Sequence, residues 1–132
     1  MALTIADVFE QGALDGGLAK LNAGTTDATG DFRLLNASSV ELAQLTLANP
    51  AFVASTSASG LTSSISGTIV KDTSITAGTI TKFELRDRNN AALIAGTVGT
   101  SGADLNVSDN VIPGTATEVT CDAGLTLTLQ LS

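Results

Sequence analysis

The strongest constraint on the fold is a set of short runs in which apolar and polar residues alternate. The clearest is residues 125–131, where four leucines alternate with two threonines and a glutamine. Successive side chains of a β-strand point to opposite faces, so this run predicts a strand with one dry face and one wet face. Many short strands separated by turns predict a mainly β protein, and we expect an antiparallel β-sandwich of jelly-roll-like form. The other runs predicted as strands are 31–36, 40–48, 79–87, 91–98, 104–107 and 116–121.

Turn-forming residues mark the ends of several runs. Asn49-Pro50 ends the second run, because proline cannot donate a hydrogen bond to a sheet. Arg88-Asn89-Asn90 separates two runs and predicts a β-hairpin. Residues 54–66 are rich in Ser, Thr and Ala without a clear period, so they fit either a loop or a weakly specified edge strand.

Residues 4–22 are the segment with a helical pattern. Thr4 and Asp7 suit a helix start, since a hydroxyl can accept a backbone N–H there and an acid favours the positive end of the helix. Three glycines weaken this helix, which therefore needs a surface to lie on. We expect one domain over residues 1–132, with a helix or arm at 1–24 and the sandwich at 25–132. The apolar stripe at helical spacing is formed by Ile5, Val8, Phe9, Leu14, Leu18 and Leu21.

The charge balance argues against two kinds of partner. The chain has a net charge of −7 and only six Lys and Arg residues, so it lacks the basic surface that nucleic-acid binding requires. The same acidity disfavours anionic membrane surfaces, and no apolar run approaches the roughly 20 residues of a membrane span. Residues 1–9 carry one acid, Asp7, and no Lys or Arg in place of the basic start of a signal peptide, so we expect synthesis in the cytoplasm.

The residue types that usually carry catalysis are missing or scattered. The chain has no His and a single cysteine, Cys121, which we interpret as a small apolar residue in or beside a strand. Carboxylates such as Glu84, Asp87 and Asp109 fit a solvated surface better than a catalytic pair. We therefore expect no enzyme, with no catalytic residues, no cofactor and no zinc or transition-metal site. The glycine-rich segment 96–102 lacks the G-K-[ST] ending of a phosphate-binding loop and predicts a turn.

One pattern resembles the opening of a calcium loop. Asp104, Asn106, Ser108 and Asp109 place oxygen-bearing side chains close together in the chain. The central glycine of such a loop is replaced by Asp109, and Thr115 stands where the bidentate glutamate belongs. A short strand followed by an Asx-rich turn is the alternative that we favour.

Three consecutive segments carry a resemblance to known proteins. Residues 79–87 read TITKFELRD, residues 91–98 read AALIAGTV, and residues 99–107 read GTSGADLNV. This order resembles a group of small virion proteins of tailed bacteriophages and prophages, in which a T-x-x-F-x-[IL]-x-D strand leads to an apolar strand ending in GxVGTSGADLNL. Residues 45–52 (LTLANPAF) match the second strand of that group, whereas Cys121 departs from its pattern. The specific part of the resemblance is GTSGADLN at 99–106.

The resemblance implies a capsid decoration or cement subunit on the virion surface. Its partners would be the major capsid protein and other copies of the same chain, with a homotrimer as one arrangement, and no nucleic acid or membrane. Residues 1–24 or the 54–66 segment would then order fully only on the shell. The alternatives are a tail or tail-tip component and, with less support, a receptor- or carbohydrate-binding module, since sugar sites commonly use aromatic faces and the chain has no Trp or Tyr.

Overall fold

The structure is a computed structural model that describes residues 7–53, 61–64, 72–120 and 126–129. The described part is mainly β, with one N-terminal helix, as the sequence predicts. Helix α1 spans Asp7–Ala19 and continues as a 3-10 turn over Lys20–Asn22. The predicted helix start at Thr4 lies outside the described residues.

A five-stranded sheet forms the largest element, with the order β2-β1-β5-β6-β7. Its strands are β1 (Asp31–Leu35), β2 (Glu41–Thr46), β5 (Lys82–Arg86), β6 (Ala92–Gly99) and β7 (Leu105–Asn106). The first four pair antiparallel, but β7 runs parallel to β6. The sheet is therefore mixed, because the chain loops back through residues 100–104 before it pairs with β6 again.

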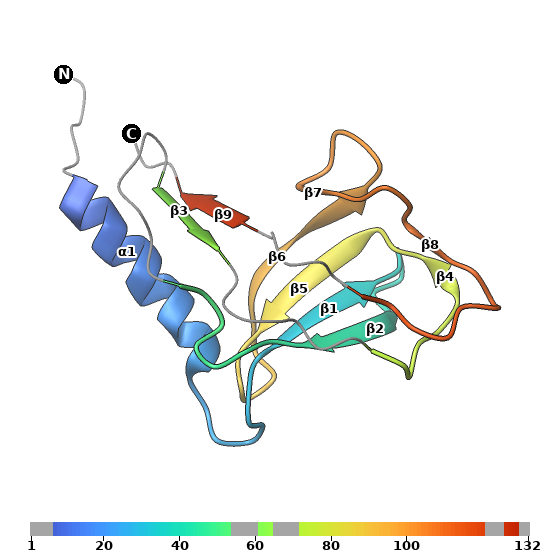
Figure 1. The fold of residues 1–132 in the computed structure, drawn as a ribbon, viewed down its shortest axis with the longest axis horizontal. Coiled ribbons are helices and arrows are strands. Elements are labelled where there is room, and N and C mark those ends of the chain that lie inside the picture. Colours follow the sequence, from blue (N-terminus) through green and yellow to red (C-terminus); the bar gives the residue numbers. More distant parts are fainter. Residues whose placement is uncertain (1–6, 54–60, 65–71, 121–125, 130–132) are drawn as a thin grey trace.

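Two small sheets accompany it. Strands β3 (Leu61–Ser64) and β9 (Thr126–Leu129) pair antiparallel, as do β4 (Gly78–Thr79) and β8 (Val111–Ile112). In Figure 1, α1 and the β3–β9 pair lie beside one another at the left, and the five-stranded sheet lies at the right. The described part shows neither a closed barrel nor a jelly roll.

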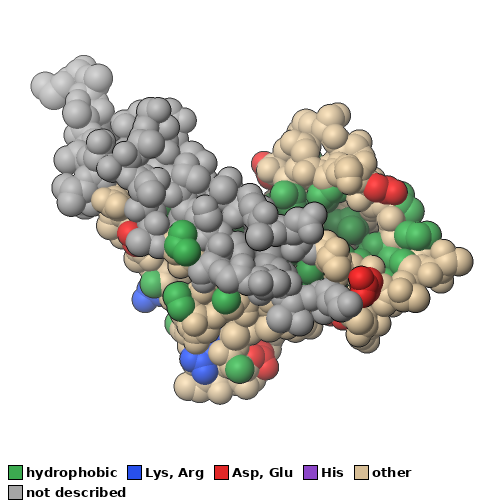
Figure 2. Space-filling view, viewed as in Figure 1, with side chains coloured by type: hydrophobic (Ala, Val, Ile, Leu, Met, Phe, Trp, Pro, Cys, Tyr) green, Lys and Arg blue, Asp and Glu red, His purple; other side chains and the backbone are tan. Residues whose placement is uncertain are grey.

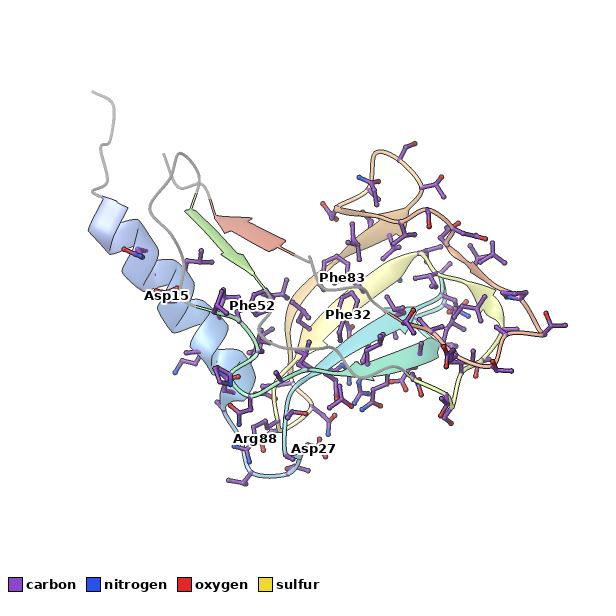
Figure 3. All side chains as sticks on the ribbon, in the orientation of Figure 1. Asp15, Asp27, Phe32, Phe52, Phe83 and Arg88 are labelled. Atoms are coloured by element: carbon purple, nitrogen blue, oxygen red, sulfur yellow. The ribbon has the colours of Figure 1, made fainter. Side chains whose placement is uncertain are left out.

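The core lies on one face of the five-stranded sheet. Phe32 on β1 stands opposite Leu45 on β2 and Leu85 on β5, and all three are buried. The ring of Phe32 packs against that of Phe83, with 5.8 Å between the centroids and an angle of 48° (Figure 3). This row of large apolar side chains arises because residues directly opposite each other on neighbouring strands point to the same face of the sheet.

The helix closes one end of this core through the apolar stripe that the sequence predicts. Leu14, Leu18 and Leu21 are buried in the same cluster as Phe32 and Leu45. The side chains of Ile5, Val8 and Phe9 lie outside the described ones. The helix thus gains its stability from packing, which offsets the low helix propensity of its glycines.

Several predicted elements are confirmed, and one is wrong. The break at Arg88-Asn89-Asn90 is the turn between β5 and β6, and Asn90 takes the left-handed conformation with φ 67°. The 54–66 segment contains β3, which supports an edge strand over a loop for residues 61–64. The strand predicted at 116–121 is wrong for its described residues, because the only pairing there is an isolated bridge between Val119 and Asp72. The leucine alternation at 125–131 is described only in its backbone at β9, so its dry and wet faces stay a prediction.

Candidate functional site

The motif that carries the family resemblance forms a closed loop between β6 and β7. The carboxylate of Asp104 accepts hydrogen bonds from the backbone N–H of Thr97 at 2.8 Å and from the Thr97 hydroxyl at 2.9 Å. The N–H of Asp104 donates in return to the Thr97 hydroxyl oxygen at 3.1 Å. The backbone hydrogen bond from Thr97, followed by the one from its hydroxyl, lowers the pKa of Asp104 below its ordinary value of 3.8. The loop is therefore held by a carboxylate that is ionised at neutral pH.

The other motif residues also have structural roles. Asn106 accepts a hydrogen bond from the N–H of Ala103 at 3.1 Å and donates to the Ala103 carbonyl oxygen at 3.3 Å. Gly102 turns the chain with φ 70°, a conformation that glycine adopts without strain. A Cβ on Gly96 would lie 2.6 Å from a ring atom of Phe83 and 3.0 Å from the Asp104 carboxylate. The motif thus specifies the shape of this loop.

The calcium-like pattern lies in the same region, but its side chains serve separate backbone groups. Asp104 bonds to Thr97 and Asn106 to Ala103, while Asp109 accepts the N–H of Val111 at 2.9 Å. Among the described residues, no group of three or more His, Cys, Asp or Glu side chains could hold a metal ion. The geometry fits a short strand followed by an Asx turn, the alternative that the sequence favoured.

The solvent-facing side of the five-stranded sheet carries a network of charges. Arg33 bonds to the carboxylate of buried Asp31 at 3.1 Å, to Glu41 at 2.9 Å and to the side-chain oxygen of Asn90. On the neighbouring strand, Arg86 pairs with Glu84 at 2.6 Å. Two arginines face three carboxylates in these pairs, so the network carries one net negative charge. Sequence analysis missed this network; its signal was the charged residues at alternate positions of 31–33 and 84–86.

At the other end of the sheet from the β6–β7 loop, the β5–β6 turn is hydrogen-bonded to the residues that follow the helix. Asn89 in the β5–β6 turn accepts hydrogen bonds from the N–H groups of Thr25 and Thr26 at 3.0 and 3.4 Å and from the Thr26 hydroxyl at 3.1 Å. Arg88 donates to the carbonyl oxygen of Asp27 at 2.7 Å, and the two residues lie side by side in Figure 3. Gly24 is required here, because a Cβ would lie 2.7 Å from the Asn89 side chain and its φ is 116°. These bonds fix the helix relative to the hairpin, and no local pattern signals them.

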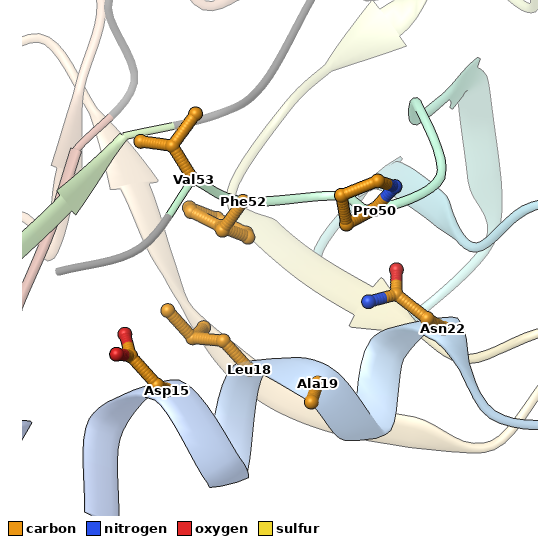
Figure 4. Close-up of a pocket in the computed structure, with 7 residues that line it drawn as sticks. All are labelled: Asp15, Leu18, Ala19, Asn22, Pro50, Phe52 and Val53. Carbon is orange, nitrogen blue, oxygen red and sulfur yellow. The ribbon is translucent and has the colours of Figure 1, made fainter. Parts of the chain in front are cut away.

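A shallow groove of about 190 Å³ lies between the helix and residues 50–53 (Figure 4). Leu18 and Phe52 form its floor, Val53 is 48% exposed at its rim, and Asp15 and Asn22 add polar groups. The side-chain oxygen of Asn22 accepts a hydrogen bond from the N–H of Ala51 at 2.9 Å. The groove is small and open, and it could take one apolar side chain of a partner.

Hydrophobic side chains also gather in a hollow at the right of the space-filling view, with acidic side chains near its border (Figure 2). The partly buried hydrophobic residues that pack against the core include Phe83, Ile94 and Leu105. The apolar surface of this part of the molecule is therefore not wholly enclosed by the described residues.

Comparisons with family models, with curated proteins and with solved structures found no match. No helix in the described part of the chain has the length and apolar character needed to cross a membrane.

Proposed function

We propose that this chain is a structural protein of a tailed-phage virion, acting as a capsid decoration or cement subunit that stabilises contacts between capsomers. The observation that carries the proposal is the resemblance centred on GTSGADLN at residues 99–106. Gly102, Asp104 and Asn106 of that segment each help to set the conformation of the loop between β6 and β7, through a positive φ or through hydrogen bonds. A match at positions that bond to one another supports a shared loop architecture more strongly than a match at positions without such contacts would.

The surface chemistry supports a binding role through many modest contacts. The described surface offers paired charges around Arg33, small side chains along β6 and isolated apolar residues such as Val40, Val53, Leu93 and Val111. A cement subunit repeated by symmetry gains affinity from many weak contacts, so it needs no single dominant pocket. The partners in this proposal are the major capsid protein and other copies of the chain.

The complete fold in this proposal is a β-sandwich of jelly-roll-like form that is antiparallel apart from the β6–β7 pair. The helix closes one end of the core of the five-stranded sheet, and β3 adjoins the helix. This arrangement supports β3–β9 as part of a second layer. An experimental structure of the assembled protein would test it by showing whether residues 54–60 and 121–125 extend those two strands.

The experiment for the function is a cryo-EM map of virions from the phage whose genome encodes the chain, together with mass spectrometry of the particles. Density that fits this chain at capsomer junctions would support the cement role and give its symmetry. Density confined to the tail would replace it with the tail-component alternative. Absence of the chain from purified particles would overturn the virion proposal.

A further inference from the structure

The hollow seen in the space-filling view leaves part of the sheet's core face open to solvent. It lies at the right of the molecule, among the segments that carry β4, β7 and β8 (Figure 1 and Figure 2). Phe83 on β5 and Ile94 on β6 point to the core face, because they alternate with residues of the charged face. Leu105 packs against the same core, and all three side chains are only partly buried. Apolar surface left open in this way is typical of a binding site.

Asp104 places a carboxylate beside this apolar surface. The point where a Cβ would stand on Gly96 is 2.6 Å from Cε1 of Phe83 and 3.0 Å from Oδ2 of Asp104. Oδ2 accepts the hydrogen bonds from Thr97, whereas Oδ1 accepts none from the described residues. Asp104 is exposed, and the hydrogen bonds from the backbone and side chain of Thr97 lower its pKa. A charged oxygen that a partner can reach thus lies next to an aromatic ring.

The segments around the hollow carry acidic charge alone. Residues 72–81 and 89–120 contain no Lys or Arg, and their charged residues are Asp72, Asp104, Asp109 and Glu118. Within the described part of the chain, the three aspartates accept hydrogen bonds only from uncharged groups. Lys82 on β5 lies on the opposite face of the sheet and donates to the β1–β2 turn. An apolar surface among carboxylates that no cation neutralises is complementary to a partner that is both apolar and basic.

Lysine and arginine side chains combine the two properties that this surface requires. Their aliphatic stems cover apolar surface while their charged heads reach polar groups. A stem that lies over Phe83 brings its head to the open oxygen of Asp104, and the ring adds an attraction for the cation. Nucleic acids and anionic lipids are disfavoured here, because their phosphates would meet the carboxylates.

We propose that the hollow binds a segment of a partner protein that combines apolar residues with Lys or Arg. Its apolar side chains pack against Phe83 and Leu105, and one of its cations bonds to Asp104. A second copy of this chain fits less well, since its Arg33 and Arg86 are already held in ion pairs. This inference goes beyond the virion proposal, because it names the chemistry of a partner and does not depend on where the chain is found.

The test uses the full chain and three synthetic peptides with blocked ends. Lys alternates with Leu in the first peptide; Glu replaces Lys in the second, and Ser replaces Leu in the third. By fluorescence polarisation in about 50 mM NaCl, we expect the Lys–Leu peptide to bind with a Kd below about 0.1 mM and the other two at least about tenfold more weakly. Raising NaCl to about 500 mM should weaken the Lys–Leu peptide at least about threefold, because salt screens exposed charges.

A pair of variants separates Asp104 from the overall charge of the chain. Asp104→Asn keeps an oxygen that can accept the Thr97 N–H but removes the charge, so it should weaken the Lys–Leu peptide about threefold. The matched control, Asp15→Asn, removes the same charge from the helix, which lies apart from Phe83 (Figure 3), and should leave the affinity unchanged. NMR of the wild-type protein keeps the proposal testable if the first variant does not fold: the Lys–Leu peptide should shift the amides of Gly96 and Leu105.

Four results would overturn the proposal. They are no binding of the Lys–Leu peptide up to about 1 mM, equal binding of the Glu–Leu peptide, shifts confined to residues outside the hollow, and a folded Asp104→Asn that binds like the wild type. Self-association of the chain that shifts the same amides would make a second copy the occupant and overturn it as well. None of these results decides whether the chain is found in virions, so the two proposals fail separately.

Discussion

Asp104 and Thr97 hold the β6–β7 loop through three mutual hydrogen bonds, although they are seven positions apart in the chain. The carboxylate does two things at once. It orders the loop that carries the family resemblance, and it occupies a backbone N–H that would otherwise remain open at the sheet edge.

The pH dependence of stability should reveal this lock. The pKa of Asp104 is lowered in the folded protein, so its contribution is present above the unfolded value of about 3.8 and is lost as pH falls through the folded value. We expect the melting temperature of Asp104→Asn to lie below that of the wild type at pH 7, with the gap closing below about pH 4. Thermal melts of both proteins from pH 2 to pH 7, at about constant ionic strength, would measure the gap. A gap that persists unchanged at the acidic end would contradict this role of the carboxylate.

Gly96→Ala should destabilise the fold. Its Cβ would lie 2.6 Å from the Phe83 ring, so that ring must move within the core face. We expect a loss of about 1–3 kcal/mol in the free energy of unfolding, measured by urea denaturation. Gly114→Ala is the control, because nothing lies within 4 Å of its new Cβ and the change should be within about 0.5 kcal/mol. Combining Gly96→Ala with Phe83→Leu should cost less than the sum of the two single changes; strict additivity would count against the steric explanation.

Asn89→Ala should loosen the attachment of the helix to the hairpin. The change removes the acceptor for three hydrogen bonds from Thr25 and Thr26. Because these groups are exposed to water, we expect a modest loss of about 1–2 kcal/mol and faster hydrogen exchange at the two threonine amides. Asn89→Asp keeps a side-chain oxygen in place and should lose less. Equal losses for the two variants would show that the acceptor is not what matters.

Arg33→Met should reveal how strongly Asp31 depends on its cation. Asp31 is 4% exposed, and Arg33 is its nearest positive partner at 3.1 Å. Removing the guanidinium leaves a buried carboxylate unpaired, and we expect a loss of about 2 kcal/mol at neutral pH. Adding Asp31→Asn should recover part of it. Arg86→Met is the control, because the Arg86–Glu84 pair is more exposed and should cost under about 1 kcal/mol. A smaller effect for Arg33 than for Arg86 in chemical denaturation would refute this ranking.

Local patterns in the sequence determined the elements that depend on nearby residues. Alternation located β1, β2, β5 and β6, helical spacing selected Leu14, Leu18 and Leu21 as buried, and turn residues marked the break at 88–90. These features were predictable because strand and helix periodicities are set by backbone geometry within a few residues.

Only the tertiary structure decided which elements meet. Strand β1 lies between β2 and β5, β7 turns parallel to β6, and Asn89 reaches residues 25–26 across more than 60 positions of the chain. Residues 116–121 show the limit most clearly, since a suitable pattern became a single bridge where no full partner strand was found among the described residues. A periodic pattern states which face can be buried, but pairing depends on the free energy of contacts between distant segments, which no local pattern contains.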